Sequence, residues 1–230
     1  MKKILSYFTR TEITIWLVSV FMITSSFLLF GGNGFLTLIA SLLGVTSIII
    51  NAKGNPLGQL LMIVFSLIYG YISYSFSYFG EMATYLGMTC PMAVFSLASW
   101  LKNPFNGKKS EVRVNTVSFS ELIFASFLTL AVTIVFFFIL RRLNTANLIP
   151  STFSVTTSFF AVYLTFRRSA WFSAAYALND IVLIILWTLA AKSDISCISV
   201  VICFAMFLVN DIYAFFNWRK IRNIKTWCNN

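Results

Sequence analysis

Two adjacent pairs of polar residues lie inside long apolar segments in the C-terminal part of the chain. Asn179 and Asp180 lie within residues 171–191, and Asn210 and Asp211 lie within residues 195–217. Polar groups are costly inside a membrane-length apolar segment and mark ligand, ion or proton pathways. An amide both donates and accepts hydrogen bonds, whereas a carboxylate pairs with a cation or carries a proton. The pairs therefore predict a site for a small polar solute, with Asp180 and Asp211 in a gating or charge-pairing role.

Further polar and aromatic residues share helical faces, because residues three, four, seven and eleven apart lie on one side of a helix. These sets are Tyr176, Asp180 and Trp187; Asn210, Tyr213 and Asn217; and Tyr85, Thr89 and Ser96, with Thr156, Thr157 and Tyr163 in a further segment. Aromatic rings stack on a planar ligand, and amides and hydroxyls bind sugar hydroxyls or a carboxamide. A structural role stays open for each residue, because Ser and Thr bond back to their own helix and Asn can tie two helices together.

The composition indicates which elements position these residues. The 230-residue chain is 59% hydrophobic and only 10% charged, against roughly 25% charged residues in soluble domains. Its apolar residues form repeated stretches near the length of about 20 that crosses a bilayer as a helix. The chain is therefore predicted to be an all-α polytopic membrane protein, with residues 1–230 forming one transport domain.

Eight membrane spans are predicted from these stretches. They cover residues 13–30, 35–50, 57–76, 82–101, 119–140, 149–166, 171–191 and 195–217. The longest polar segment, residues 102–118, is expected to be a linker with no fold of its own. Glu81 and Glu121 lie at span ends and are expected to be interfacial.

The basic residues predict the orientation in the cell membrane. With the N-terminus in the cytoplasm, all but three of the 17 Lys and Arg residues fall on the cytoplasmic side, the exceptions being Arg141, Arg142 and Lys192. This matches the excess of positive charge in cytoplasmic loops. Both termini are therefore predicted to be cytoplasmic, which requires an even number of spans.

Two spans end alike and predict an internal repeat. Residues 99–102 read Ser-Trp-Leu-Lys and residues 217–220 read Asn-Trp-Arg-Lys, so Trp100 and Trp218 correspond at an offset of 118 residues. The spans then form an extra helix (13–30), a first triplet (35–101), a linker helix (119–140) and a second triplet (149–217). Transporters with such parallel 3+1+3 repeats bind substrate between the repeats. The alternative is that aromatic and basic residues recur at membrane interfaces without any repeat.

Several function classes are disfavoured by the residues present. The chain has no His, and its four Cys form no CxxC pair, so a metal site is not expected. No GxxxxGK[ST] loop is present for ATP, and no basic face is interleaved with aromatics for nucleic acid. The sequence shows no combination of a nucleophile and a base that would indicate an enzyme.

The order and spacing of several segments resemble the PnuC-type nicotinamide riboside transporter family. The resemblance covers residues 59–74, 78–81, 91–100 and above all 151–220. Ala177-Leu178-Asn179-Asp180-Ile181 with Trp187, and Asn210-Asp211-Ile212-Tyr213 with Asn217-Trp218, carry most of it. The Trp-x-x-Trp that many members have before the Asn is replaced here by Phe172 and Ala175, and the adjacent Trp171 is a candidate substitute.

The resemblance implies a fold related to SWEET sugar transporters and uptake of nicotinamide riboside by facilitated diffusion. It implies no cofactor, a cytoplasmic kinase that traps the substrate by phosphorylation, and a small homo-oligomer such as a trimer. Substrate-binding positions carried over are Asn179, Asn210 and Tyr213. Together with the residue patterns, the candidate site is Asn179, Asn210, Tyr213, Tyr176, Trp171, Thr157 and Thr89. The alternatives are thiamine, riboflavin or deoxynucleoside transport by the same fold, a SWEET-like sugar facilitator, and a membrane subunit that transports nothing.

Overall fold

The computed structural model describes residues 7–30, 34–75 and 79–227, with side chains described up to residue 223. Some residues used above lie outside this description. They are Lys2 and Lys3, Tyr78, and Cys228, together with Lys225, whose side chain is not described. The helices are α2 (Arg10–Phe30), α3 (Phe35–Ala52), α4 (Leu57–Ser75), α5 (Phe79–Thr84), η1 (Tyr85–Thr89), α6 (Cys90–Lys102), α7 (Phe119–Arg142), α8 (Leu148–Phe166), α9 (Phe172–Ala191), η2 (Ile195–Cys197) and α10 (Ile198–Trp227).

The prediction of eight spans is confirmed. Eight helical segments of the described chain are long and apolar enough to cross a membrane, with α5, η1 and α6 forming one segment, Phe79–Lys102, and η2 joined to α10. Helices satisfy all backbone hydrogen bonds within one segment, which a bilayer interior requires. The main difference from the predicted bounds is at the C-terminus, where α10 continues to Trp227 instead of ending near residue 217.

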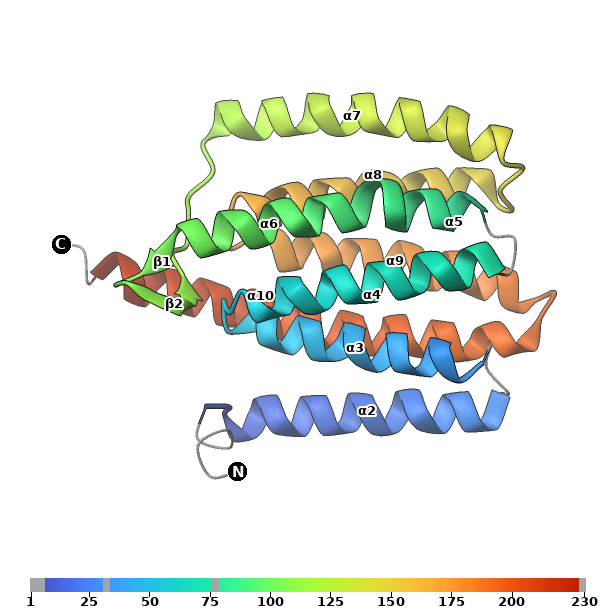
Figure 1. Ribbon diagram of the computed structural model, residues 1–230, viewed down its shortest axis with the longest axis horizontal. Helices are drawn as coiled ribbons and strands as arrows, with labels where there is room; N and C mark the ends of the chain where they lie inside the picture. The colour runs from blue at the N-terminus through green and yellow to red at the C-terminus, as the bar shows by residue number, and fades with distance from the viewer. Residues whose placement is uncertain (1–6, 31–33, 76–78, 228–230) are drawn as a thin grey trace.

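Six of the spans form a closed ring. Going round it, α3 packs on α4, α4 on α6, α6 on α8, α8 on α9, α9 on α10, and α10 on α3. The other two spans lie outside the ring, with α2 against α10 and α3, and α7 against α8. Figure 1 shows α2 and α7 at opposite edges of the bundle. The ring is made of the six spans that the sequence assigned to the two triplets.

The segment between α6 and α7 has a fold of its own, and the prediction of an unstructured linker is wrong. Strands β1 (Pro104–Phe105) and β2 (Lys108–Val112) pair antiparallel around a turn at Asn106 and Gly107. Both turn residues have positive φ, which Asn and Gly adopt readily. The hairpin lies at the end of the bundle where α10 ends (Figure 1). We call this the hairpin end, and the opposite end the loop end.

Helices α3 and α8 end at the hairpin end with the same backbone geometry. Gly54 follows α3 with φ 68°, and Arg168 follows α8 with φ 57°. One residue later, the amide of Asn55 donates to the carbonyl of Ile50, and the amide of Ser169 donates to the carbonyl of Leu164. A left-handed residue followed by this six-residue hydrogen bond is a common way to end a helix. Each position at the end of α3 is 114 residues before its counterpart at the end of α8, which is close to the offset of 118 between Trp100 and Trp218.

The hairpin segment bridges these two helix ends. The Val112 amide donates to the Gly54 carbonyl over 2.9 Å, and the Asn115 amide donates to the Arg168 carbonyl over 3.0 Å. The Val112 side chain is buried beside Trp100 and Trp218. The segment therefore ties together the ends of two ring helices that are far apart in sequence.

Candidate functional site

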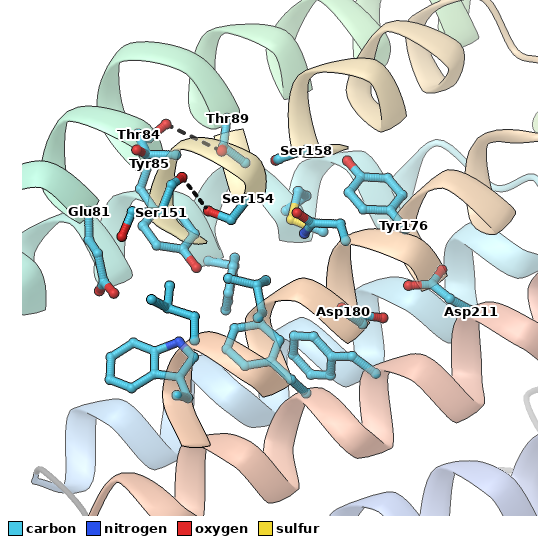
Figure 2. Close-up of a pocket in the computed structure, with 18 of the residues that line it drawn as sticks. Glu81, Thr84, Tyr85, Thr89, Ser151, Ser154, Ser158, Tyr176, Asp180 and Asp211 are labelled. Carbon is cyan, nitrogen blue, oxygen red and sulfur yellow. Dashed lines mark hydrogen bonds between the residues drawn. The ribbon is translucent and has the colours of Figure 1, made fainter. Parts of the chain in front are cut away.

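A cavity of about 110 Å³, measured as the volume open to the centre of a water molecule, lies inside the six-helix ring. One water needs roughly 10–15 Å³ by that measure, so the cavity holds several waters or a small solute. Its lining comes from every span of the ring and extends from Gly80 and Thr145 at the loop end to Phe172 towards the hairpin end. Figure 2 shows the polar and aromatic side chains that converge on it.

Helix α9 supplies the largest share of the lining. Tyr176, Asp180 and Trp187 all line the cavity, as does Asn179. The Asn179 Oδ1 accepts a 2.8 Å hydrogen bond from the Thr157 hydroxyl on α8. That contact fixes the carboxamide of Asn179 at the edge of the cavity. Thr157 is not itself a lining residue, so it positions Asn179.

The span Phe79–Lys102 contributes its lining residues around a π-helical turn. Tyr85 and Thr89 line the cavity and lie at the two ends of η1. Pro91 follows at the start of α6, and because Pro cannot donate its backbone hydrogen bond, a regular α-helix is disfavoured just before it. The widened turn is closed instead by the Cys90 amide, which donates to the Tyr85 carbonyl. Such π-turns are frequent at functional sites.

Helix α8 presents a face of hydroxyl groups that the sequence analysis missed. Ser151, Ser154 and Ser158 line the cavity, and Figure 2 shows them on one side of it. Their spacing of three and then four residues is the helical signal that could have identified them. The Ser154 hydroxyl donates to the Ser151 carbonyl over 3.0 Å, which leaves the oxygen lone pairs free to accept from a solute.

Two further lining residues were assigned elsewhere from the sequence. Glu81 was expected at the interface but lines the cavity, and Asn51 was placed in a loop but lies in the last turn of α3. Asn51 is held by neighbours on both sides, since its Oδ1 accepts from Gln59 Nε2 at 2.9 Å and its Nδ2 donates to the Ser47 hydroxyl at 3.3 Å. Their positions at segment ends hid both residues from a search for polar groups inside spans.

Asp180 and Asp211 meet across the contact between α9 and α10. Both line the cavity and each is only 3% exposed. Their carboxyl groups interact electrostatically, and Asp180 Oδ2 has no hydrogen-bond partner. Figure 2 shows Glu81 on the far side of the drawn lining from this pair. Among the described residues that line the cavity, none is Lys or Arg.

Asn210 and Tyr213 do not face the cavity, so the expectation that they share a site with Asn179 needs correction. The Asn210 side chain is fully buried and donates to the Ser19 hydroxyl of α2 over 2.8 Å. The Tyr213 hydroxyl donates to Glu12 Oε1, also on α2, over 3.1 Å. Since adjacent residues on a helix point about 100° apart, Asp211 faces the cavity while Asn210 faces α2. These residues attach the extra helix to the ring.

Trp171 also lies away from the cavity. It is 51% exposed, and its ring contacts Phe215 and lies 5.8 Å from the Arg219 guanidinium carbon. Phe172, the neighbouring residue, lines the cavity instead. Aromatic partners for a bound ring are therefore offered by Phe172, Tyr176, Tyr85 and Trp187, all of which are lining residues.

A cluster of three aromatic residues packs beside the cavity towards the hairpin end. Phe172 packs against Trp218 with ring centroids 4.8 Å apart and against Trp100 at 6.3 Å, and the two Trp rings are 5.4 Å apart. Both Trp residues are fully buried. We refer to Trp100, Trp218 and Phe172 as the Trp cluster. It separates the cavity from the buried Val112 of the hairpin segment, which packs in the same group.

Both Trp residues are fixed by equivalent hydrogen bonds to opposite halves of the ring. The Trp100 indole N–H donates to the Thr165 carbonyl near the end of α8, over 2.9 Å. The Trp218 indole N–H donates to the Asn51 carbonyl near the end of α3, over 2.8 Å. The residue before each Trp makes a matching bond to the last residue of the same helix. The Ser99 hydroxyl donates to the Phe166 carbonyl of α8 over 2.8 Å. The Asn217 side-chain amide donates to the Ala52 carbonyl of α3 over 2.8 Å. The end of α6 therefore binds the end of α8, and α10 binds the end of α3.

Comparison with known proteins gives one consistent result. The profile of a family described as "Nicotinamide mononucleotide transporter" matches residues 34–220. A protein of Neisseria mucosa named "Nicotinamide riboside transporter PnuC" is 24% identical over 211 residues, which cover 90% of this chain and 80% of that protein. A solved structure titled "Crystal structure of the Vitamin B3 transporter PnuC" superposes with a TM-score of 0.80 and 22% identity, covering 95% of this chain and 94% of the other.

Proposed function

The chain belongs to the nicotinamide mononucleotide transporter family, and on this premise we propose that it carries nicotinamide riboside across the membrane by facilitated diffusion. One observation carries the choice of the riboside over its phosphorylated form. The cavity is lined by Glu81, Asp180 and Asp211, and no Lys or Arg is among its described lining residues. A phosphate group carries negative charge and is normally bound by basic residues or helix N-termini. A riboside offers hydroxyls, a carboxamide and a planar ring, which match the lining.

The ligand contacts follow from the geometry of the lining. We assign the ring to the aromatic residues Tyr176, Phe172 and Tyr85, because offset or edge contacts between aromatic groups add to apolar burial. Asn179 is fixed by Thr157 and is assigned to a carboxamide or sugar hydroxyl. Thr89 and the serines of α8 supply further hydroxyl partners. Asn210, Tyr213 and Trp171 are assigned no direct ligand contact.

The transport cycle is proposed to use the two triplets as the parts that move. The matching ends of α3 and α8, and the reciprocal hydrogen bonds of Trp100 and Trp218, support a repeat of two triplets around α7. Opening towards the hairpin end requires the Trp cluster to separate, since it lies between the cavity and that end. The charge distribution supports a cytoplasmic hairpin end, with both termini on that side.

Net uptake by a facilitator requires that the substrate be consumed inside the cell. We propose that a separate cytoplasmic kinase phosphorylates the riboside, since an added phosphate prevents return through an acidic cavity. The kinase depends on the transporter only for its substrate and needs no contact with this chain. A small homo-oligomer, as the family resemblance implies, is part of the same proposal and is checked by the mass of the purified protein in detergent.

The proposal is tested by the thermal stability of the purified protein with a panel of ligands. A ligand that binds only the folded state raises the unfolding temperature, and the increase grows with the ratio of ligand concentration to dissociation constant. Nicotinamide riboside is expected to stabilise the protein at lower concentration than nicotinamide mononucleotide, thiamine, riboflavin or a deoxynucleoside. A larger effect from another member of the panel would reassign the substrate within the same fold. No effect from any member would contradict the assignment of the cavity as a binding site.

A further inference from the structure

Asp180 and Asp211 form a buried carboxyl pair whose composition is unusual for a membrane interior. Both side chains are 97% buried within the folded chain, being 3% exposed, and both belong to the cavity lining. The two carboxyl groups interact electrostatically, and Asp180 Oδ2 has no hydrogen-bond partner. A buried carboxylate oxygen without a donor is costly. The site is therefore incomplete without something that supplies positive charge or a proton.

The groups around the pair do not supply that charge. The titratable groups that face it are Cys203 from α10, Tyr176 from α9, and Tyr85 from η1. Glu81 of α5 lines the opposite side of the cavity, and the lining residues from α3, α4 and α8 carry no ionisable group. None of these described neighbours is a Lys or Arg. The charge must come from solvent or from a ligand.

Two carboxyl groups in contact cannot both be ionised in a low-dielectric site, because their repulsion adds to the cost of burial. An empty pair therefore holds at least one proton. A cation that enters the cavity changes this balance, since it interacts favourably with both carboxylates at once. The pyridinium ring of nicotinamide riboside is such a cation. Tyr176 near the pair and Tyr85 further along the lining are aromatic residues that suit a flat, positively charged ring.

We propose that Asp180 and Asp211 act together as the charge-selecting element of the site, binding a cationic ring in exchange for the proton that they share when the cavity is empty. This inference rests on the proposed function and deepens it. No covalent step is involved, and the proton released on binding passes to solvent through the cavity. The pair thereby distinguishes a cationic solute from a neutral one of the same shape.

The test uses two ligands that differ by one hydride. Nicotinamide riboside carries a positive ring, whereas its reduced dihydro form is neutral and nearly the same size. Isothermal titration calorimetry on the full-length wild-type protein is expected to give at least about tenfold tighter binding of the cationic form, as one favourable charge interaction in a buried site provides. Repeating the titration in buffers of different ionisation enthalpy is expected to show proton release with the cationic form and none with the neutral form.

The variants Asp180→Asn and Asp211→Asn remove one charge while keeping side-chain size. Each is expected to weaken the cationic form about tenfold or more and to leave the neutral form within about threefold. Retained binding of the neutral form demonstrates that the variant is folded. Glu81→Gln is the matched control, because it removes a lining carboxylate outside the pair, and it is expected to affect the cationic form less than either Asp variant.

Three results separate this inference from the proposed function. Equal affinity of the wild type for the two ligands would overturn the charge-selecting role while leaving riboside transport intact. Cation binding without proton release would overturn the shared proton. No binding of either ligand by the wild type would contradict the proposed function itself, and the inference with it.

Discussion

The hydrogen bonds of the Trp cluster give a direct prediction about how the hairpin end opens. Trp218→Phe and Trp100→Phe each keep an aromatic ring but remove one buried N–H donor, to the Asn51 carbonyl and the Thr165 carbonyl respectively. Each carbonyl keeps a second donor, since the Gly54 amide donates to Asn51 and the Arg168 amide to Thr165. The cost is therefore at least that of one net hydrogen bond, about 1 kcal/mol, without the larger penalty of an orphaned carbonyl, and the lost ring volume adds to it.

If the Trp cluster separates when the hairpin end opens, the lost hydrogen bond destabilises the closed state and leaves the open state unchanged. A change of about 1 kcal/mol raises the open fraction about fivefold. The two variants are expected to increase the open fraction by the same factor, because their hydrogen bonds are equivalent. The double variant is expected to deviate from simple addition, because the two rings are in contact at 5.4 Å and neighbouring sites couple.

The assay is the labelling rate of a buried reporter thiol. Ser173→Cys places the thiol next to Phe172, at a position that is fully buried and has no hydrogen-bond partner. With the four native Cys residues replaced, the maleimide labelling rate of this reporter follows the open population when labelling is slow relative to closing. We expect a rate increase of about fivefold in either Trp→Phe variant.

Trp171→Phe is the matched control. Trp171 lies at the same end of the bundle but is half exposed and packs on Phe215 and Arg219 instead of the cluster. Its substitution is expected to leave the labelling rate unchanged. Equal rates in all three variants, or a larger effect from Trp171→Phe, would refute the role of the Trp cluster in closing this end.

Three further predictions concern single positions. Asn179→Ala is expected to weaken riboside binding about tenfold with little loss of expression, as calorimetry and detergent yield would show, because it removes a buried hydrogen-bonding group from the cavity; unchanged affinity would exclude it from the pocket. Asn210→Ala is expected to lower thermal stability by about 1 kcal/mol without changing ligand affinity, because it ties α10 to α2; a weakened affinity would return it to the site. Gly58→Ala is expected to unfold the protein at lower temperature, since the added Cβ would meet the Asn51 side chain and backbone nitrogen at 2.2–2.8 Å, whereas Gly87→Ala meets nothing within 4 Å and serves as the control for the same melting measurement.

The spans could be predicted because a bilayer imposes length and hydropathy on every crossing segment. The face of α9 was also predictable, since Tyr176, Asp180 and Trp187 stand out as polar or aromatic residues at helical spacing. For α10 the same reasoning was incomplete. This helix packs on α9, α3 and α2, so it carries polar residues on several sides. The pattern alone did not tell which of Asn210 and Asp211 faces the cavity.

Other features depended on contacts that no local pattern encodes. Glu81 lies near a segment boundary, and its place in the cavity depends on how α5 packs in the ring. The π-turn around Tyr85–Thr89 shifts the helical register by one residue, which a strict period of 3.6 does not follow. The hairpin strands are short and polar, and only the burial of Val112 against Trp100 and Trp218 explains why they are ordered. These are tertiary interactions between residues far apart in sequence.

The most direct measurement of the central claim is the flux of labelled nicotinamide riboside into liposomes that contain the purified protein. Facilitated diffusion predicts saturable entry without ATP and without an ion gradient, with equal inside and outside concentrations at the end point. Accumulation above the outside concentration, or flux that appears only when a proton or sodium gradient is imposed, would contradict facilitated diffusion. Entry no faster than in empty liposomes, by a protein that still binds the riboside, would contradict transport altogether.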